Sequence, residues 1–144
     1  MRCVLGCSVA QVFQQPAFAQ TFELWKEDGI LHLTVAANAR VDVGHMKEFI
    51  RLVAALDRSG KAPVVMGHSA NVVVSPMARG LLRRVCGANG HPVALVVLDR
   101  TSQAQAELFL HVERPAFPFK VFHDPALALR WARSRSPVTG QVDR

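Results

Sequence analysis

The sequence predicts an α/β fold, a single domain in which helices cover a mixed sheet of about five strands, mainly on one face of the sheet. Three observations predict this class. Residues 92–98 form an unbroken apolar run with the length of a strand buried on both faces, which is typical of a parallel sheet. Segments with helical apolar spacing alternate with such runs along the chain. Half of the 144 residues are hydrophobic, enough for one core without disulfides or a metal.

The domain is expected to open with an antiparallel hairpin. Residues 22–26 and 30–35 show the alternation of apolar and polar side chains that is typical of strands, and Glu27-Asp28-Gly29 separates them. An Asp-Gly pair between two such runs is among the strongest short signals for a hairpin turn.

A first helix is expected from its cap at Asp42 to about Arg58, and Ser59-Gly60 is expected to end it. Apolar residues recur every three or four positions and form one stripe: Met46, Phe49, Ile50, Val53 and Leu56. The polar residues expected on the opposite, solvated side are Lys47, Glu48, Arg51 and Asp57.

The middle of the chain predicts a strand, a loop and a second helix. Residues 62–66 form a short apolar strand, and residues 67–71 form the loop that leaves it. The valines at 72–74 are expected either to be partly buried or to pack wholly inside. Ser75-Pro76 gives the next helix an N-cap and a proline at its first position, and this helix closes near Gly87. Its apolar side consists of Ala78, Leu81, Leu82 and Val85.

The last third of the chain adds a helix, a strand and a final helix. Thr101 or Ser102 is expected to cap the third helix, residues 119–122 form a strand, and Asp124-Pro125 begins the last helix. Because β-α-β crossovers are right-handed, a strand order that follows the sequence would place every helix on the same face of the sheet. The apolar contacts expected of these two helices come from Leu108, Phe109, Val112, Leu127, Ala128 and Trp131.

The two ends of the chain differ from its middle. Residues 1–20 lack periodicity and are expected to form a flexible leader, with a weak signal peptide or a start-site artefact as alternatives. Residues 21–134 form the domain, and the polar residues 135–144 are expected to be a disordered tail. Three cysteines without a C-x-x-C spacing favour a reducing compartment, the cytoplasm, and no apolar stretch is long enough to span a membrane.

Two stretches carry a resemblance to a known family. Residues 122–131 read FHDPALALRW, an F-x-D-x-x-x-A-x-x-W pattern, and the hairpin at 24–32 reads LWKEDGILH. Across residues 21–134 the chain resembles the STAS domain, the fold of sulphate-transporter tails and of bacterial anti-sigma-factor antagonists. It resembles more closely a group of stand-alone bacterial STAS-like, or SpoIIAA-like, proteins of unassigned function. The resemblance implies a non-enzymatic regulatory module that interacts with another protein.

One departure from the family pattern concerns phosphorylation. Antagonists of the phospho-switch type carry an Asp-Ser-Ser-Gly-like turn at the start of the second helix, where a kinase phosphorylates a serine. The aligned position here is Pro76 or Met77, and neither has a hydroxyl group. Ser75 has one, but the Ser-Pro pair fits a plain helix N-cap. The resemblance therefore implies a module without the usual phosphoacceptor serine.

The second helix also holds the candidate docking residues, which are Ser75, Arg79, Arg83 and Arg84. Arg79 and Arg83 are four positions apart, and Arg84 is beside them. They can bind an acidic protein or a phosphate group, or they can form an ordinary solvated face. The net charge of +6 permits an acidic protein partner, and self-association is the alternative. No nucleic acid is expected, because aromatic residues are not interleaved with these arginines.

Other kinds of site have weaker signals. A small-molecule or lipid-headgroup sensor would need an apolar cavity near residues 68–74, between helices and sheet. A hydrolase would need Ser69 or Ser75 within hydrogen-bonding distance of a histidine. No metal and no cofactor is expected, since none of the six histidines has a partner at ligand spacing. Cys86 is expected to be a small core residue.

Overall fold

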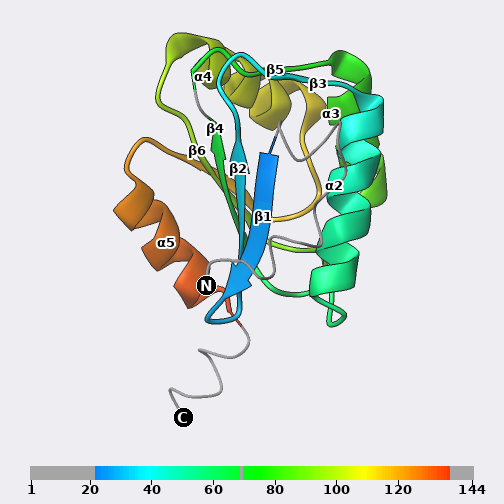
Figure 1. Cartoon of the computed structure of the whole chain (residues 1–144), viewed down its shortest axis with the longest axis vertical. Helices are drawn as coiled ribbons and strands as arrows, with labels where there is room; N and C mark the ends of the chain where they lie inside the picture. Colours follow the sequence, from blue (N-terminus) through cyan, green and yellow to red (C-terminus); the bar gives the residue numbers. More distant parts are fainter. Residues whose placement is uncertain (1–21, 69, 137–144) are drawn as a thin grey trace.

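Five strands form the central sheet of the computed structural model, which describes residues 22–68 and 70–136 (Figure 1). Their order in space follows the sequence: β1 (Phe22–Glu27), β2 (Ile30–Val35), β4 (Val64–His68), β6 (Val93–Val96) and β7 (Phe119–Phe122). β1 and β2 are antiparallel and the other neighbours are parallel, which confirms the predicted mixed sheet. The expected leader and all but two residues of the expected tail lie outside the described residues.

The predicted opening hairpin is confirmed. Asp28 and Gly29 connect β1 to β2, and both have positive φ angles, 54° and 78°. Two such residues form the turn whose twist matches that of the flanking strands, and glycine adopts this conformation without steric cost. On the strands themselves, Trp25 stacks on His32 with ring centroids 5.2 Å apart.

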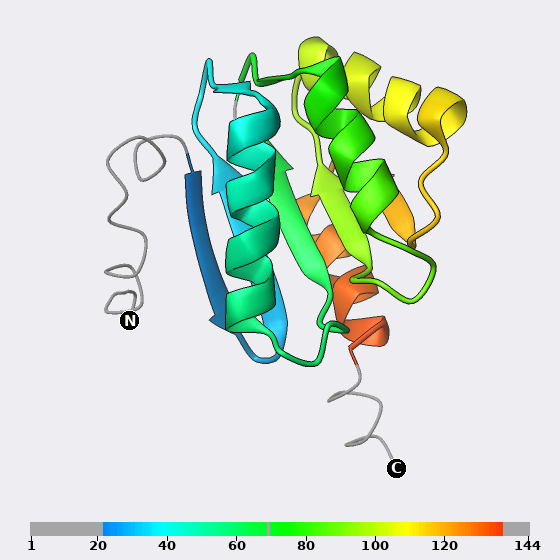
Figure 2. The same ribbon diagram turned by 90° about the vertical axis from the view of Figure 1, so that its right-hand side faces the viewer.

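Three helical segments cover one face of the sheet, and one helix covers the other (Figure 2). α2 (Val43–Leu56), α3 (Pro76–Val85) and α4 (Arg100–Leu108), which continues as the π-helical turn η2 (Phe109–Glu113), share the first face. α5 (Pro125–Ser134) packs on the opposite face. The prediction that helices lie mainly on one face is confirmed, but the stricter expectation of every helix on that face is wrong. α5 follows the last strand, so it is not a crossover and the handedness rule does not constrain it.

The core divides along the two faces of the sheet. On the α5 side, Ala94, Val96 and Ala128 are buried, and the rings of Phe122 and Trp131 are 5.9 Å apart. The side under the other helices holds the larger core, whose buried members include Leu31, Leu33, Val35, Val64, Val93, Met46, Phe49, Leu52 and Ala78. Alternate residues of each strand therefore contribute to different layers.

The helix caps decide where the helices begin, and most agree with the prediction. Asp42, Ser75 and Asp124 each accept a hydrogen bond from a backbone N–H of the helix that follows. α4 is capped by Asp99 instead of the predicted Thr101 or Ser102. One oxygen of Asp99 accepts from Ser102 N at 3.0 Å, and the other accepts from the backbone N–H of Asn71 at 2.6 Å. A carboxylate can satisfy both the helix and the neighbouring loop with separate oxygens.

Several apolar residues expected in the core lie at the surface. Leu108, Val112 and Leu127 are exposed, and so is Val85 at the end of α3. Leu108 ends α4 and Val112 lies in the π-helical turn, where Phe109 is the buried residue. Ala128 alone among the predicted contacts of α5 is fully buried, with Trp131 half-buried beside it.

A second, two-stranded sheet was not predicted. β3 (Arg40–Val41) pairs in parallel with β5 (Val73–Val74), just before the helices α2 and α3 begin. Strands of two residues are too short for an alternation pattern to be recognised. Residues 72–74 were expected either to be partly buried or to pack wholly inside. Val72 is fully buried, whereas Val73 and Val74 of β5 are half-buried, so each expectation holds for part of this run. β4 lies two residues later than the predicted strand at 62–66.

Candidate functional site

The predicted docking residues on α3 fall into two groups. Ser75 is the N-cap, and its hydroxyl accepts a hydrogen bond from Ala78 N at 3.1 Å. Arg83 and Arg84 are exposed, but the side chain of Arg79 is only 12 % exposed. The structure therefore does not bring the three arginines together on one solvated face.

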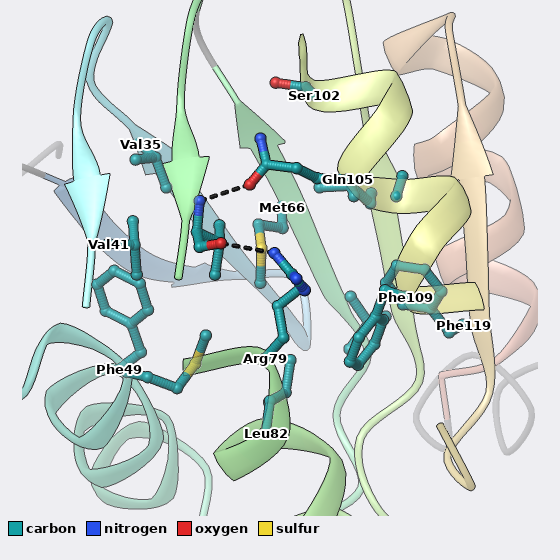
Figure 3. A pocket seen from close by; sticks show the side chains of 15 residues that line it. Val35, Val41, Phe49, Met66, Arg79, Leu82, Ser102, Gln105, Phe109 and Phe119 are labelled. Atoms are coloured by element: carbon teal, nitrogen blue, oxygen red, sulfur yellow. Dashed lines mark hydrogen bonds between the residues drawn. The ribbon is translucent and has the colours of Figure 1, made fainter. Parts of the chain in front are cut away.

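Arg79 links three elements from the inside of the molecule. Its Nη1 donates to the carbonyl oxygen of Val74 on β5 at 2.7 Å (Figure 3). Its Nε donates to Oε2 of Glu113 at 3.2 Å. Glu113 is the last residue of η2, and Arg114 closes this turn with a positive φ of 50°. The π turn thus brings a carboxylate from the end of one helical segment against the first turn of α3.

The exposed residues of α3 present a different surface. We define the α3 surface as Met77, Arg83, Arg84 and Val85. Met77 is 71 % exposed and Val85 is 53 % exposed. A Cβ added at Gly80 would meet a terminal nitrogen of Arg84 at 3.4 Å, so the guanidinium of Arg84 lies close over the helix backbone. Exposed apolar side chains and positive charge therefore share one helix.

A cavity of about 60 Å³ lies between the sheet and the helices α2, α3 and α4 (Figure 3). Its apolar lining comes from all three layers around it: Val35, Val41, Met46, Phe49, Met66, Val74, Leu82, Val93, Leu95, Ala106, Phe109 and Phe119. Three polar side chains complete the lining: Arg79, Ser102 and Gln105. Of residues 68–74, near which a sensor would need its cavity, Val74 on β5 is part of the lining.

The polar residues of the cavity differ in how fully they are hydrogen-bonded. The side-chain amide of Gln105 accepts a hydrogen bond from Val74 N and donates one to Val72 O. It therefore pairs with the backbone at β5 as a neighbouring strand would. Ser102 is 1 % exposed, and its Oγ has no hydrogen-bond partner. A buried hydroxyl without a partner loses its hydration without compensation, which makes it a group that a bound molecule could satisfy.

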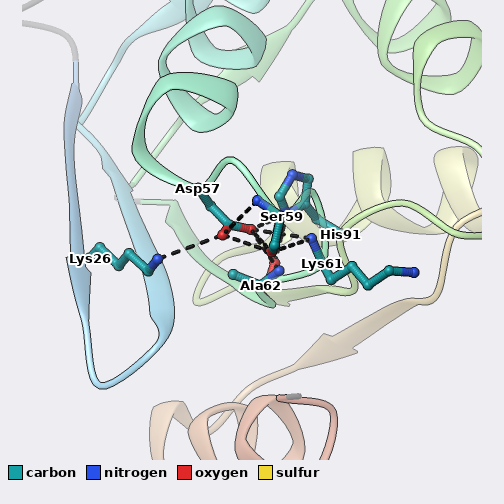
Figure 4. Close-up of polar contacts among 6 residues, drawn as sticks. All are labelled: Lys26, Asp57, Ser59, Lys61, Ala62 and His91. Carbon is teal, nitrogen blue, oxygen red and sulfur yellow. Dashed lines mark hydrogen bonds and ion pairs between the residues drawn. The ribbon is translucent and has the colours of Figure 1, made fainter. Parts of the chain in front are cut away.

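A second polar cluster surrounds Asp57, which was predicted on the solvated side of its helix. That prediction is wrong, because Asp57 is 6 % exposed. Its carboxylate accepts from the backbone N–H groups of Ala62 at 2.9 Å and Lys61 at 3.2 Å, and from the Ser59 hydroxyl at 2.8 Å (Figure 4). Lys26 Nζ on β1 is 3.6 Å away. The Asp-Arg-Ser-Gly order after the helix is the local signal for such a turn.

His91 contributes to the same cluster. Its Nδ1 is 2.7 Å from the carbonyl oxygen of Ala62 and 3.7 Å from Oδ2 of Asp57. A carbonyl oxygen can only accept, so this nitrogen carries the proton. The cluster holds the segment between α2 and β4 against β1 and the start of β6, and its geometry indicates a structural role.

The charge state of Asp57 makes the stability of the protein depend on pH. Burial raises the pKa of this carboxyl. The hydrogen bonds from Ala62 and Ser59 and the charge of Lys26 together lower the pKa by more than burial raises it, so it lies below its ordinary value. The ionised carboxylate therefore contributes stability above the unfolded pKa of about 3.9, and this contribution is lost as pH falls through the lower folded pKa.

We expect the difference in unfolding free energy between the wild-type protein and Asp57→Asn to be largest above about pH 5 and to narrow below about pH 4. Urea unfolding of both proteins at several pH values measures this difference. A difference that stays constant from pH 7 to pH 3 would contradict the assignment of the low pKa to Asp57.

The described residues among the remaining candidates for chemistry have structural contacts. Burial raises the pKa of the half-buried Cys86 thiol, and the side chain packs against the core, as expected of a structural cysteine. The Ser75 hydroxyl serves the helix cap, and Ser69 lies outside the described residues. Within residues 22–68 and 70–136, no group of three or more potential ligands could hold a metal ion. No helix in that part of the chain has the length and apolarity needed to cross a membrane.

Comparisons with known proteins agree with this architecture. The family model described as "Domain of unknown function (DUF7793)" matches residues 24–135. No curated protein matches the chain in sequence. Among solved structures, the chain is similar to an uncharacterised protein of the DUF3478 family from Shewanella loihica PV-4, which has a SpoIIAA-like fold. The match covers 78 % of this chain and 92 % of that protein, with 14 % sequence identity and a TM-score of 0.54. The predicted resemblance to SpoIIAA-like proteins is thus confirmed at the level of the fold.

Proposed function

Since the chain belongs to the DUF7793 family and has a SpoIIAA-like fold, we propose that it is a non-enzymatic STAS-like module that regulates a protein partner by binding it. The proposal places it in the bacterial cytoplasm, in keeping with a half-buried, unpaired Cys86. Fold alone does not determine function, so the proposal depends on the character of the surface.

The observation that carries the proposal is the α3 surface. Met77 and Val85 expose apolar side chains on one helix, and Arg83 and Arg84 add positive charge to it. Methionine and arginine are enriched at protein interfaces, and arginine is common among the residues that dominate binding energy. An acidic partner with an apolar contact residue would match this surface in both charge and polarity.

The structure limits which arginines can take part in such docking. Arg79 already donates to Val74 and Glu113, so its role in the proposal is to hold α3 in place. Ser75 lies at the start of the same helix as its cap, and the next two positions, Pro76 and Met77, have no hydroxyl group. The proposed module therefore works without the phosphoacceptor serine of the family's phospho-switch members.

We expect that changing Arg83 and Arg84 together to glutamate abolishes partner binding while the protein stays folded. Reversing two exposed charges at the docking surface opposes an acidic partner, and exposed sites contribute little to stability. Affinity capture from the native host, quantified by mass spectrometry against the wild-type protein, measures the loss. We expect at least a tenfold reduction, equivalent to about 1.4 kcal/mol of binding free energy.

The matched control is the pair Arg58→Glu and Arg130→Glu, which makes the same change in net charge at exposed positions outside α3. This control should retain the partner at wild-type yield. If both double variants lose the partner equally, the effect is one of net charge, and the docking surface is not on α3. A captured partner that proves to be a second copy of the chain would identify self-association.

The cavity favours a second candidate function, that of a small-molecule sensor. The observation in its favour is the orphaned Ser102 hydroxyl in a mainly apolar cavity behind α3. Ligand sites are commonly apolar with a small number of placed polar groups. A lipid headgroup fits less well, because Arg79, the charged residue of the described lining, is already paired with Glu113.

A further inference from the structure

We infer that the cavity takes a small neutral molecule with an apolar body and one hydrogen-bond acceptor, and that this acceptor receives the proton of the Ser102 hydroxyl. The inference rests on the second function proposed above and names the class of ligand. Three properties of the cavity lead to it: its size, the charge balance of its walls and the single unsatisfied polar atom.

The size of the cavity limits the ligand to a few atoms. A water molecule needs roughly 10–15 Å³ of such space, so a cavity of about 60 Å³ accepts about four to six atoms of similar size. The walls are apolar on the sheet side, where Met66, Leu95 and Phe119 contribute, and on the α2 side. An apolar body of this size would replace empty space next to these side chains with van der Waals contacts.

The charge balance of the walls favours a neutral ligand. Arg79 is the charged side chain among the described lining residues, and Glu113 compensates its charge at 3.2 Å. An anionic ligand would have to compete with this carboxylate, and a cation would meet the guanidinium. Both would also lose hydration on entering apolar surroundings, which is costly for an ion.

Among the described lining residues, one fully buried side-chain polar atom lacks a hydrogen-bond partner, and it indicates the polar group of the ligand. Both ends of the Gln105 amide are occupied by the backbone of Val72 and Val74. Ser102 Oγ has no partner and is buried at the α4 wall of the cavity (Figure 3). A serine hydroxyl has one proton to donate as well as lone pairs that can accept, and a ligand with a carbonyl or ether oxygen receives that proton. A hydrocarbon of the same shape fills the space but leaves this donor unsatisfied.

The methionines of the chain allow a direct test by NMR of the protein labelled with ¹³C at the methionine methyl groups. Met46 and Met66 line the cavity, whereas Met77 lies exposed on α3 and serves as an internal reference. The probes are 2-butanone, which has a carbonyl oxygen, and 2-methyl-1-butene, a hydrocarbon of similar shape. We expect both probes to shift the signals of Met46 and Met66 in a saturable manner while the Met77 signal stays unchanged.

The variant Ser102→Ala separates the polar contribution from the apolar one. It should fold, because it removes a buried polar atom that has no partner. We expect it to weaken 2-butanone binding about three- to tenfold, the range that a neutral hydrogen bond covers, and to leave 2-methyl-1-butene binding unchanged. Thr101→Ala, which removes an exposed hydroxyl next to it in sequence, should change neither probe.

The outcomes separate the ligand class from the sensor function. If neither probe shifts Met46 or Met66, the cavity does not bind ligands of this class, and both the sensor function and the inferred ligand class are wrong. If 2-methyl-1-butene binds but 2-butanone does not, the cavity takes ligands and the inferred acceptor is wrong. The inferred acceptor is also wrong if Ser102→Ala weakens both probes equally.

Discussion

Replacing Arg79 with methionine is expected to lower the free energy of unfolding by about 3 kcal/mol, because it leaves the carboxylate of Glu113 in a largely buried position without its cation. The hydrogen bond to the Val74 carbonyl is lost at the same time. Methionine keeps the apolar stem of the side chain, so the loss of packing is small. In a domain of this size, the midpoint of thermal unfolding should fall by about 10 °C.

Urea unfolding of Arg79→Met, Glu113→Gln and the double variant measures the coupling between the two side chains. We expect a coupling energy of at least about 1 kcal/mol, so that the double variant is less destabilised than the sum of the single variants. Arg83→Met, which removes an exposed arginine from the same helix, is the matched control and should change stability by less than about 0.5 kcal/mol. Equal losses for Arg79→Met and Arg83→Met would show that Arg79 is not held as described.

Replacing Asp57 with alanine is expected to cost about 3 kcal/mol of stability. The variant loses hydrogen bonds from Ala62, Lys61 and Ser59, and it leaves the buried N–H of Ala62 without an acceptor. Asp57→Asn retains one acceptor oxygen and should lose about half as much, because a neutral amide makes weaker hydrogen bonds than a carboxylate. Unfolding in urea at pH 7 measures both effects.

Asp124→Ala is the matched control for Asp57→Ala. Asp124 also accepts a backbone N–H, that of Ala126 at 2.9 Å, but its side chain lies at the exposed start of α5. Loss of such a helix cap typically costs about 1 kcal/mol. If the two alanine variants are destabilised to the same extent, the buried surroundings of Asp57 do not strengthen its interactions.

The sequence was informative wherever the partners of a residue are close to it along the chain. The Asp28-Gly29 turn and the caps at Asp42, Ser75 and Asp124 each depend on contacts within a few residues, and all four were predicted correctly. The sheet followed from the apolar runs that lead into and out of these signals. Together they predicted the five-stranded mixed sheet, but not the small sheet of β3 and β5 or the face on which α5 packs.

The candidate site depends on contacts that are distant in sequence, and there the predictions were less successful. Arg79 and Glu113 are 34 positions apart, and they meet because the π-helical turn η2 continues α4 and ends at Glu113. No local pattern distinguishes this arginine from Arg83, which has the same helical context and faces solvent. Asp57 likewise has neighbours that are distant in sequence, namely Lys26 on β1 and His91 before β6.

The proposed docking function depends most directly on whether a partner contacts the α3 surface in the cell. Site-specific photo-crosslinking answers this, with p-benzoylphenylalanine placed at Met77 or, as a control, at Ala54, an exposed position on α2. We expect a discrete crosslinked protein from position 77, none from position 54, and loss of the adduct when Arg83 and Arg84 are changed to glutamate. Adducts of equal yield at both positions, or a position-77 adduct that survives the loss of both arginines, would contradict docking on the α3 surface.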